Sequence, residues 1–356
     1  MTSIPTSGRR PRTEPLEKCP TCFKTILREL FTVTDRNHDV PGEFRYVECS
    51  ACATVFQNPM VIDEDLHLCY PQEYVPYDFD PEMPEVDFEA STTFRERLRK
   101  SIADSVWGED RREGSSWLGR LLASFRTFRE RAFFGLVIDD CLPNGRGKDW
   151  ALDVGCGAGW MLKRLAKVGW KVEGIEWDER AAAVARERTG ANVWAGDFRE
   201  IDLPKGKYSL VFLSHVFEHF REPVSALGRF HELLADGGKL VLVFPNPESI
   251  DAKWYGRDWF AWEVPRHLIL PSSQIVGKLA FDAGFSACHV TTRVAKHYWT
   301  KSKAYVMEQH PEKNEPELRF KESLGFGLQK FANEIGFKVG SELIVVMEKA
   351  ATQPEK

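Results

Sequence analysis

The sequence has no long apolar run and no apolar segment near its start. No stretch reaches the roughly 18 to 20 consecutive apolar residues of a membrane-spanning helix. The start, M-T-S-I-P-T-S-G-R-R-P-R-T-E-P, is basic and contains proline, but it lacks the apolar segment that a secretory signal requires. These two absences predict a cytoplasmic protein, in which thiols stay reduced.

The sequence also lacks a strong excess of charge and any internal repeat. Its formal net charge of −5 over 356 residues gives no general attraction to polyanions, and no strong basic patch is present. We therefore expect no nucleic-acid partner. With 43% hydrophobic and 28% charged residues, the composition is that of an ordinary globular protein.

Four of the eight cysteines form two closely spaced pairs. Cys19 and Cys22 lie in C-P-T-C, and Cys49 and Cys52 lie in C-S-A-C. Where thiols are reduced, this spacing predicts one tetrahedral zinc site closed by four thiolates, which leaves no open position for catalysis. The alternative is two unconnected pairs of free thiols. A segment this short has little core of its own, so we expect the metal to decide whether it folds.

The chain divides into four predicted parts. We expect a disordered tail over 1–16, a zinc-ribbon-like module over 17–75, a linker with a helical extension over 76–142, and an α/β domain over 143–350. Arginines alternate with phenylalanines in 125–138, which predicts an amphipathic helix. That helix either packs on the α/β domain or contacts an anionic membrane or a lipid-linked substrate without spanning the bilayer.

Strand and helix patterns alternate from Trp150 onward. Short apolar runs such as A-L-D-V, K-V-E-G-I and Y-S-L-V-F-L-S are bounded by glycine or proline and separated by helical segments. This pattern is typical of a parallel sheet covered on both faces, so the predicted fold is a doubly wound, Rossmann-like α/β domain.

The loop after the first of these strands contains three closely spaced glycines. L-D-V-G-C-G-A-G-W places Gly155, Gly157 and Gly159 between a strand and a helix, where the missing Cβ allows a sharp turn and a close approach to a ligand. The dinucleotide fingerprint has its third glycine one residue later. Asp153, just before the loop, instead suits a ligand that carries ammonium and sulfonium charges.

Two further acids follow later strands. Glu176 ends the second strand about 20 residues beyond the loop, where a ribose-hydroxyl acceptor is expected. Asp197 in A-G-D-F ends the third strand, with Phe198 beside it, and is placed to bind an adenine amino group. Together these positions predict a nucleoside-containing cofactor.

The chain resembles the class I S-adenosylmethionine-dependent methyltransferases. L-D-V-G-C-G-A-G-W, E-G-I-E-W-D, A-G-D-F, Y-S-L-V-F-L-S-H-V-F-E-H and L-L-A-D-G-G-K-L-V-L-V-F-P-N occur in that family's order between about Trp150 and Lys349. The resemblance implies a seven-stranded sheet and S-adenosylmethionine as cofactor. It places Asp153, Gly155 and Gly157 at the methionine moiety, Glu176 at the ribose and Asp197 at the adenine. The other expected cofactor contacts are Cys156, Gly159, Trp177, Phe198 and Ser214.

The segment S-H-V-F-E-H-F follows the fourth strand and faces the methyl group in the family it resembles. Because of their i, i+3, i+4 spacing, we expect His215, Glu218 and His219 to share one helical face. The leading interpretation makes His219 a general base supported by Glu218, with His267 as an alternative base. A second interpretation, from relatives with E-x-x-E-H here, is a divalent-metal site, although this chain has histidine at the first position. The third is a structural Glu-His pair.

Two insertions are predicted, over about 247–271 and 292–338. The first is rich in aromatic residues, which predicts a substrate pocket with phosphate or polar contacts, or else a hydrophobic minicore. The pocket residues are Trp254, Tyr255, Trp259, Trp262 and Arg266. The second insertion is expected to form a lid or an oligomer contact.

The narrower resemblance is to bacterial small-molecule methyltransferases that carry a zinc module and act in sugar or polysaccharide biosynthesis. It implies methyl transfer to a sugar or a glycan intermediate. The alternatives are an RNA methyltransferase with a zinc knuckle and a non-catalytic protein that binds S-adenosylmethionine.

Overall fold

The structure is a computed structural model that describes residues 8–70, 116–124, 149–167, 169–312 and 315–351, with positions 94, 97, 98, 101, 102 and 105. The predicted helix over 125–138 lies outside the described residues. The chain divides into two compact units. The first comprises Met1–Tyr74, Leu213–Glu232 and Leu242–Ala350, and the second comprises Val75–Phe212, Leu233–Val241 and Ala351–Lys356.

The α/β class is confirmed, and the main sheet has seven strands in the order β12-β13-β10-β9-β6-β7-β8. These are β6 (Trp150–Val154), β7 (Lys171–Glu176), β8 (Asn192–Ala195), β9 (Tyr208–Ser214), β10 (Leu234–Pro245), β12 (Ala287–Arg293) and β13 (Glu342–Glu348). The expectation of a parallel sheet holds for β6, β7 and β8. It is wrong for β12 and β13, which pair antiparallel from Ala287 opposite Glu348 to Arg293 opposite Glu342. The sheet is therefore mixed.

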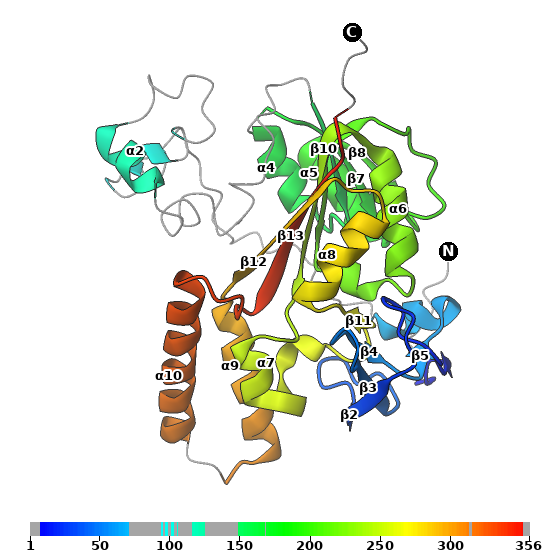
Figure 1. Ribbon diagram of the computed structural model, residues 1–356, viewed down its shortest axis with the longest axis vertical. Helices are drawn as coiled ribbons and strands as arrows, with labels where there is room; N and C mark the ends of the chain where they lie inside the picture. The colour runs from blue at the N-terminus through cyan, green and yellow to red at the C-terminus, as the bar shows by residue number, and fades with distance from the viewer. Residues whose placement is uncertain are drawn as a thin grey trace. The chain divides into compact units, whose positions relative to one another are not determined.

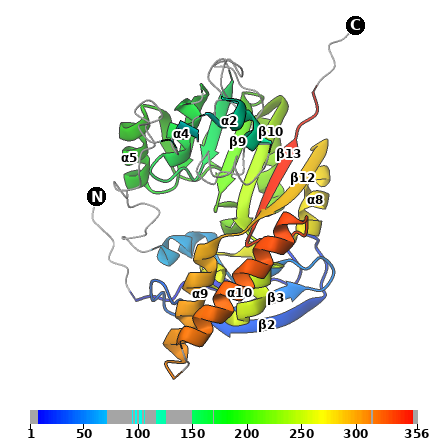
Figure 2. The ribbon, with the colours of Figure 1, turned by 90° about the vertical axis from the view of Figure 1, so that its left-hand side faces the viewer.

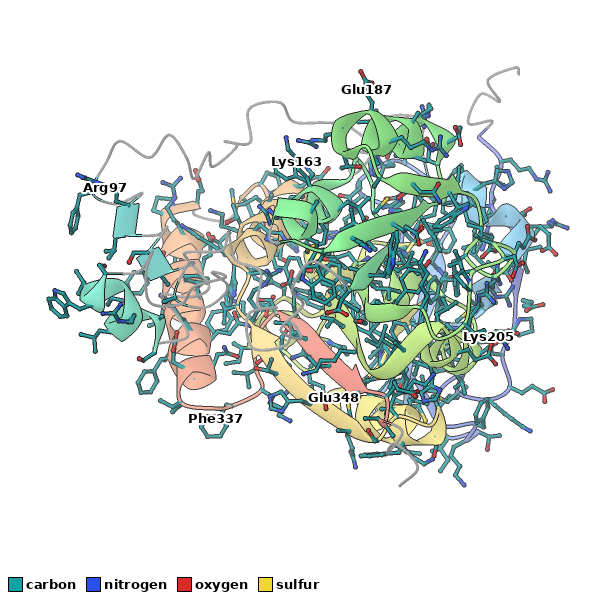
Figure 3. The ribbon with its side chains drawn as sticks, turned by 90° about the horizontal axis from the view of Figure 1, so that it is seen from above. Arg97, Lys163, Glu187, Lys205, Phe337 and Glu348 are labelled. Atoms are coloured by element: carbon teal, nitrogen blue, oxygen red, sulfur yellow. The ribbon has the colours of Figure 1, made fainter. Side chains whose placement is uncertain are left out.

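The second unit alternates strands with helices α4 (Trp160–Lys167) and α5 (Glu179–Thr189), after the short α2 (Trp117–Ala123). The Asp178 side chain caps α5 by accepting from the amides of Arg180 and Ala181, and Gly190 ends the helix with a left-handed φ of 66°. The buried face of α5 is made of alanines, whereas Glu187 projects away from the ribbon (Figure 3). Small alanine side chains let the helix lie close to the sheet.

The first unit contains a second sheet, of four strands in the order β11-β4-β3-β2. Its strands are β2 (Leu27–Val33), β3 (Phe44–Cys49), β4 (Val55–Gln57) and β11 (Ile269–Leu270), and they lie side by side in Figure 1. A two-stranded sheet of β1 (Thr13–Glu14) and β5 (Met60–Val61) precedes the 3-10 helix η1 (Asp63–Cys69). The segment predicted as the zinc module thus forms a sheet with a strand from far along the chain.

The rest of the first unit is largely helical. Its helices are η3 (Phe217–His219), α6 (Pro223–Leu233), α7 (Ile250–Tyr255), η4 (Gly256–Asp258), η5 (Phe260–Trp262), α8 (Ser273–Asp282), α9 (Lys296–Gln309) and α10 (Glu315–Glu334). The second predicted insertion forms the pair α9 and α10, which lie side by side (Figure 2). A Cβ on Gly325 would lie 2.4 Å from the Trp299 ring, so this glycine permits the close packing. No helix in the described ranges is long and apolar enough to cross a membrane.

Candidate functional site

The four predicted zinc ligands lie together in the first unit. Their sulfur atoms are all within 4.8 Å of one another, with 3.7 Å between Cys19 and Cys52 and 3.5 Å between Cys22 and Cys49. A zinc–sulfur bond of about 2.3 Å places the sulfur atoms of a tetrahedral site about 3.8 Å apart. The thiol cluster therefore has the dimensions of such a site.

The two cysteine pairs have the same backbone geometry. The amide of Cys19 donates to Lys24 O and its carbonyl accepts from Phe23 N, and Cys49 makes the equivalent bonds to Thr54 and Ala53. The residue after each second cysteine has a left-handed φ, 60° at Phe23 and 55° at Ala53. Non-glycine residues rarely adopt this conformation. Its repetition in both pairs indicates two matched knuckles, as a four-thiolate site requires.

The predicted cofactor loop adopts a conformation that requires glycine. Gly155, Gly157 and Gly159 have φ values of 71°, 51° and 81°. The amide of Gly155 donates to Ile175 O on β7, which fixes the turn to the neighbouring strand. Gly159 has a different task from the other two, because a Cβ there would lie 3.0 Å from Thr189 Cγ2 on α5. It permits close packing of α4 on α5.

Two buried carboxylates lie beside this loop. Glu176 accepts from the amide of Gly157 at 2.8 Å and from that of Asp178 at 3.1 Å, which joins the end of β7 to the glycine loop. Burial raises the pKa of Glu176. Burial, followed by the charge of Glu176, raises the pKa of Asp153 well above its usual range. Such a pair favours a positively charged ligand, which would offset the cost of ionising both groups.

The remaining predicted cofactor residues occupy varied positions. Asp197 accepts from the amide and guanidinium of Arg199, which partly occupies it. Cys156 packs with Leu162, Ala182, Ala185 and Val193, so its side chain belongs to the core. Phe198 is buried, Trp177 is 52% exposed, and Ser214 ends β9 in the first unit.

The segment from His215 to His219 does not form the helical face that its spacing predicts. His215 has a left-handed φ of 56°, and only Phe217–His219 forms a 3-10 turn. His215 nevertheless lies between two buried carboxylates, with Nδ1 at 3.4 Å from Glu218 and Nε2 at 3.3 Å from Glu342. Burial alone would lower the pKa of His215, but these carboxylates outweigh it and raise that pKa to about 10. His215 is therefore protonated at neutral pH.

His219 is held by backbone oxygens on both sides of its ring. Nδ1 lies 2.9 Å from Arg266 O, and Nε2 lies 3.1 Å from His215 O. The Tyr70 hydroxyl is also 3.1 Å from Nδ1. These contacts occupy Nε2 with His215 O and Nδ1 with Arg266 O and the Tyr70 hydroxyl. This geometry leaves neither nitrogen open to a substrate hydroxyl.

Among the described residues, Nε2 of the buried His267 makes no hydrogen bond, unlike either nitrogen of His219. Its Nδ1 donates to Ala261 O at 2.8 Å, so in the neutral ring Nε2 carries a lone pair. Nε2 lies 3.6 Å from Glu218 and 3.5 Å from Glu263. Burial lowers the pKa of His267, which favours the neutral ring. Among the described residues, neither carboxylate oxygen of Glu218 accepts a hydrogen bond, although the side chain is fully buried.

The same groups also have the spacing of a metal site. One ligand atom each from Glu218, His219 and His267 lies within 4.8 Å of the others. Glu218 and the neutral Nε2 of His267 are both acceptors and lie 3.6 Å apart. Such a pair suits a shared proton or a divalent cation.

The aromatic segment is mostly interior, which fits the minicore and not the predicted pocket. Trp259 and Trp262 are buried, and their indole N–H groups donate to Asp251 and to Gly256 O. Tyr255 packs on Trp299, whereas Trp254 stays 46% exposed.

The predicted contact from Arg266 to substrate is contradicted by the partners of its guanidinium, which lie within the protein. Arg266 is fully buried and forms a bidentate ion pair with Asp35, so its guanidinium does not face a ligand.

Three acids of this site were not predicted from the sequence. Asp35 and Glu342 carry no local pattern that distinguishes them from other acids, because their partners lie far along the chain. Glu263 could have been found from its i, i+4 spacing to His267. Asp35 and Glu342 are buried and Glu263 is partly buried, and burial is a tertiary property.

The family profile described as Methyltransferase domain matches residues 125–290. This match includes the glycine loop and the strand-end acids on which the resemblance to S-adenosylmethionine-dependent methyltransferases was based.

Among curated relatives, the chain is 29% identical over 166 residues to a ubiquinone biosynthesis O-methyltransferase of Pseudomonas paraeruginosa, a match covering 41% of this chain and 70% of that protein. It is also 29% identical over 169 residues to an uncharacterized 37.1 kDa protein in transposon TN4556 of Streptomyces fradiae, covering 44% and 48%. With most of the curated relatives it matches, the chain shares about half of their length. A solved S-adenosylmethionine-dependent methyltransferase from Mesorhizobium loti aligns at a TM-score of 0.41 and 20% identity, over 61% of this chain and 98% of that chain.

Proposed function

We propose that this chain transfers a methyl group from S-adenosylmethionine to a small-molecule acceptor. The observation that carries the proposal is the glycine loop with its left-handed φ angles, joined through Gly157 to the carboxylate of Glu176. Bound there, the cofactor supplies an electrophilic methyl group on a sulfonium. The buried Asp153 and Glu176 favour that cation over a pyrophosphate, because their raised pKa values make ionisation easier beside a positive charge than beside an anion.

The base in this proposal is His267. An acceptor hydroxyl loses its proton during transfer, and a neutral imidazole with a free nitrogen is suited to take it. His267 has that nitrogen, and Glu218 beside it would stabilise the imidazolium that forms. His215, already protonated between Glu218 and Glu342, supplies a fixed positive charge near the same carboxylates.

A divalent cation at Glu218 and His267 is the second role for these residues, and His219 could join it only by giving up one of its contacts with the protein. The two oxygens of Glu218, which accept no hydrogen bond from the described residues, favour this role. The cation would polarise the acceptor oxygen and make a free base unnecessary. Elemental analysis of the purified protein distinguishes the roles. A divalent ion beyond the four-thiolate zinc, lost in His267→Asn, would favour this second role.

The four cysteines hold a structural zinc ion in this proposal. Their spacing suits tetrahedral thiolate ligation, and all four positions are filled by the protein. The ion would stabilise the N-terminal sheet and take no part in methyl transfer.

The observations define the acceptor molecule less closely than they define the cofactor. Matched relatives named as O-methyltransferases favour a hydroxyl acceptor on a small molecule. The resemblance to sugar-modifying enzymes adds a sugar or glycan intermediate as the first acceptor to test. A cytoplasmic location and the domain boundaries at 17–75 and 143–350 remain part of the proposal.

Calorimetry with S-adenosylmethionine, S-adenosylhomocysteine and NADH tests the cofactor. We expect micromolar binding of the first two and none of NADH. Glu176→Ala should weaken binding strongly, whereas Glu179→Ala, at the exposed start of α5, should not. Binding of NADH alone, or equal affinity in both variants, would refute the proposal. Release of S-adenosylhomocysteine from panels of nucleotide sugars, phenols and RNA then identifies the acceptor class.

A further inference from the structure

The segment that carries His267 is built into the N-terminal sheet. Ile269 and Leu270 pair with Phe56 and Val55 of β4. Just beyond them, the Ser272 hydroxyl donates to the carbonyl of the predicted zinc ligand Cys52 at 2.6 Å. The segment after His267 is therefore attached directly to the cysteine knuckle.

The other end of the segment is fixed by a buried ion pair. Arg266 donates to both oxygens of Asp35 at 2.9 and 3.1 Å and also to Cys69 O at 3.1 Å. Arg266 is fully buried and Asp35 is 5% exposed. Asp35 is itself held in place, because its carboxylate accepts from the amides of Asn37, His38 and Val40. Two buried charges paired in this way are costly to separate, so the pair has one geometry.

Each residue from Arg266 to Leu268 makes a backbone hydrogen bond that holds the segment in place. The carbonyl of Arg266 accepts from the His219 ring, and the amide of Leu268 donates to Glu218 O at 2.9 Å. Between them, the carbonyl of His267 accepts from the Tyr46 hydroxyl on β3 at 2.6 Å. The ring of His267 thus has its place relative to Glu218 set from both sides.

We propose that Arg266 is a positioning residue. Its ion pair with Asp35 ties the segment of His267 to the N-terminal sheet and so fixes the His267 ring beside Glu218. The inference rests on the proposed function for its catalytic meaning, but the positioning itself is a property of the protein alone. The β11–β4 ladder and the cluster of four cysteines also hold the N-terminal sheet together, independently of this pair.

The test compares Asp35→Asn with a matched control in the same module, Asp65→Asn. Asp65 also forms a bidentate pair, with Arg12 at 2.9 Å for each contact, but it makes no bond to the segment of His267. Two readouts are measured on the full-length, zinc-loaded protein. One is hydrogen exchange at the amide of Leu268, and the other is the nitrogen NMR spectrum of the histidine rings, assigned with His267→Asn.

We expect Asp35→Asn to speed exchange at Leu268 about tenfold or more and to shift the His267 ring resonances, while Asp65→Asn changes neither. S-adenosylmethionine affinity should stay within twofold in both, since Asp153 and Glu176 belong to the other unit. If Asp35→Asn unfolds, Tyr46→Phe removes the hydroxyl bond from the same sheet to His267 O and should also shift the His267 ring resonances.

Unchanged His267 resonances in a folded Asp35→Asn protein would overturn the inference, as would an equal effect from Asp65→Asn. Failure of the wild-type protein to bind S-adenosylmethionine would refute the proposed function but leave the exchange and NMR results standing, so the two failures are distinguishable.

Discussion

Gly159→Ala tests whether Gly159 serves helix packing, in contrast to the cofactor-turn glycines Gly155 and Gly157. Gly159 follows the cofactor turn, and its φ of 81° is left-handed. A Cβ there would lie 3.0 Å from Thr189 Cγ2 and 3.1 Å from Ala185 Cβ, both on α5. Gly190 offers a matched control, because its φ of 66° is also left-handed but a Cβ would meet nothing within 4 Å.

The difference between the two variants isolates the packing contribution. A non-glycine residue in the left-handed region costs about 1–2 kcal/mol, and this cost applies to both positions. The lower entropy of the unfolded alanine chain affects both variants equally. Overpacking adds about 1–3 kcal/mol at Gly159 alone. We therefore expect Gly190→Ala to lose about 1 kcal/mol of unfolding free energy and Gly159→Ala about 2–4 kcal/mol.

Urea unfolding measures the stability difference, and calorimetry measures the consequence for the cofactor. Because α4 begins at Trp160, pushing it away from α5 moves the glycine loop with it. S-adenosylmethionine affinity should fall about tenfold in Gly159→Ala, equivalent to about 1.4 kcal/mol, and stay unchanged in Gly190→Ala. Equal losses of stability in the two variants would refute the packing role assigned to Gly159.

Three further outcomes are expected. The purified protein should contain one zinc ion per chain by elemental analysis, and Cys49→Ser should release it and unfold the N-terminal sheet; a folded, zinc-free variant would contradict this. Because the pKa of His215 is raised from its ordinary 6.5 to about 10, its contribution to stability is present below pH 6.5 and lost as pH rises toward 10. Denaturant titrations should therefore show a decline over this window that is smaller in His215→Gln; solvent screening of this partly exposed ring limits its size. Finally, since burial raises the pKa of Asp153, binding of the cationic cofactor should release protons, so calorimetric heats should vary with the ionisation enthalpy of the buffer; heats independent of the buffer would count against Asp153 as the cation's partner.

Short sequence patterns correctly predicted the elements that depend on neighbouring residues. The glycine loop was found because a turn between a strand and a helix needs left-handed residues at fixed positions, and the structure has them at Gly155, Gly157 and Gly159. The cysteine pairs were found because a spacing of two residues lets both thiols bind one metal ion, and in the structure the four sulfur atoms lie together. The α/β alternation was equally visible, since it is a periodic property of the chain.

The prediction that His215, Glu218 and His219 share one helical face was wrong. Their i, i+3, i+4 spacing fits a helix, but His215 adopts a left-handed φ, and Glu342 of β13 faces its ring from the other side. No local pattern contains a partner so far along the chain.

The sequence determined the cofactor turn, the two cysteine pairs and the strand–helix order, because each is read from short local motifs: the glycine turn, the two C-x-x-C pairs and the period of each strand or helix. Tertiary structure alone decided which histidine keeps a free nitrogen, which tryptophans are interior, and that Arg266 pairs with Asp35 instead of a ligand. The physical reason is that hydrogen-bond partners and burial set the charge and access of a side chain, and in this protein those partners come from segments far apart in the chain.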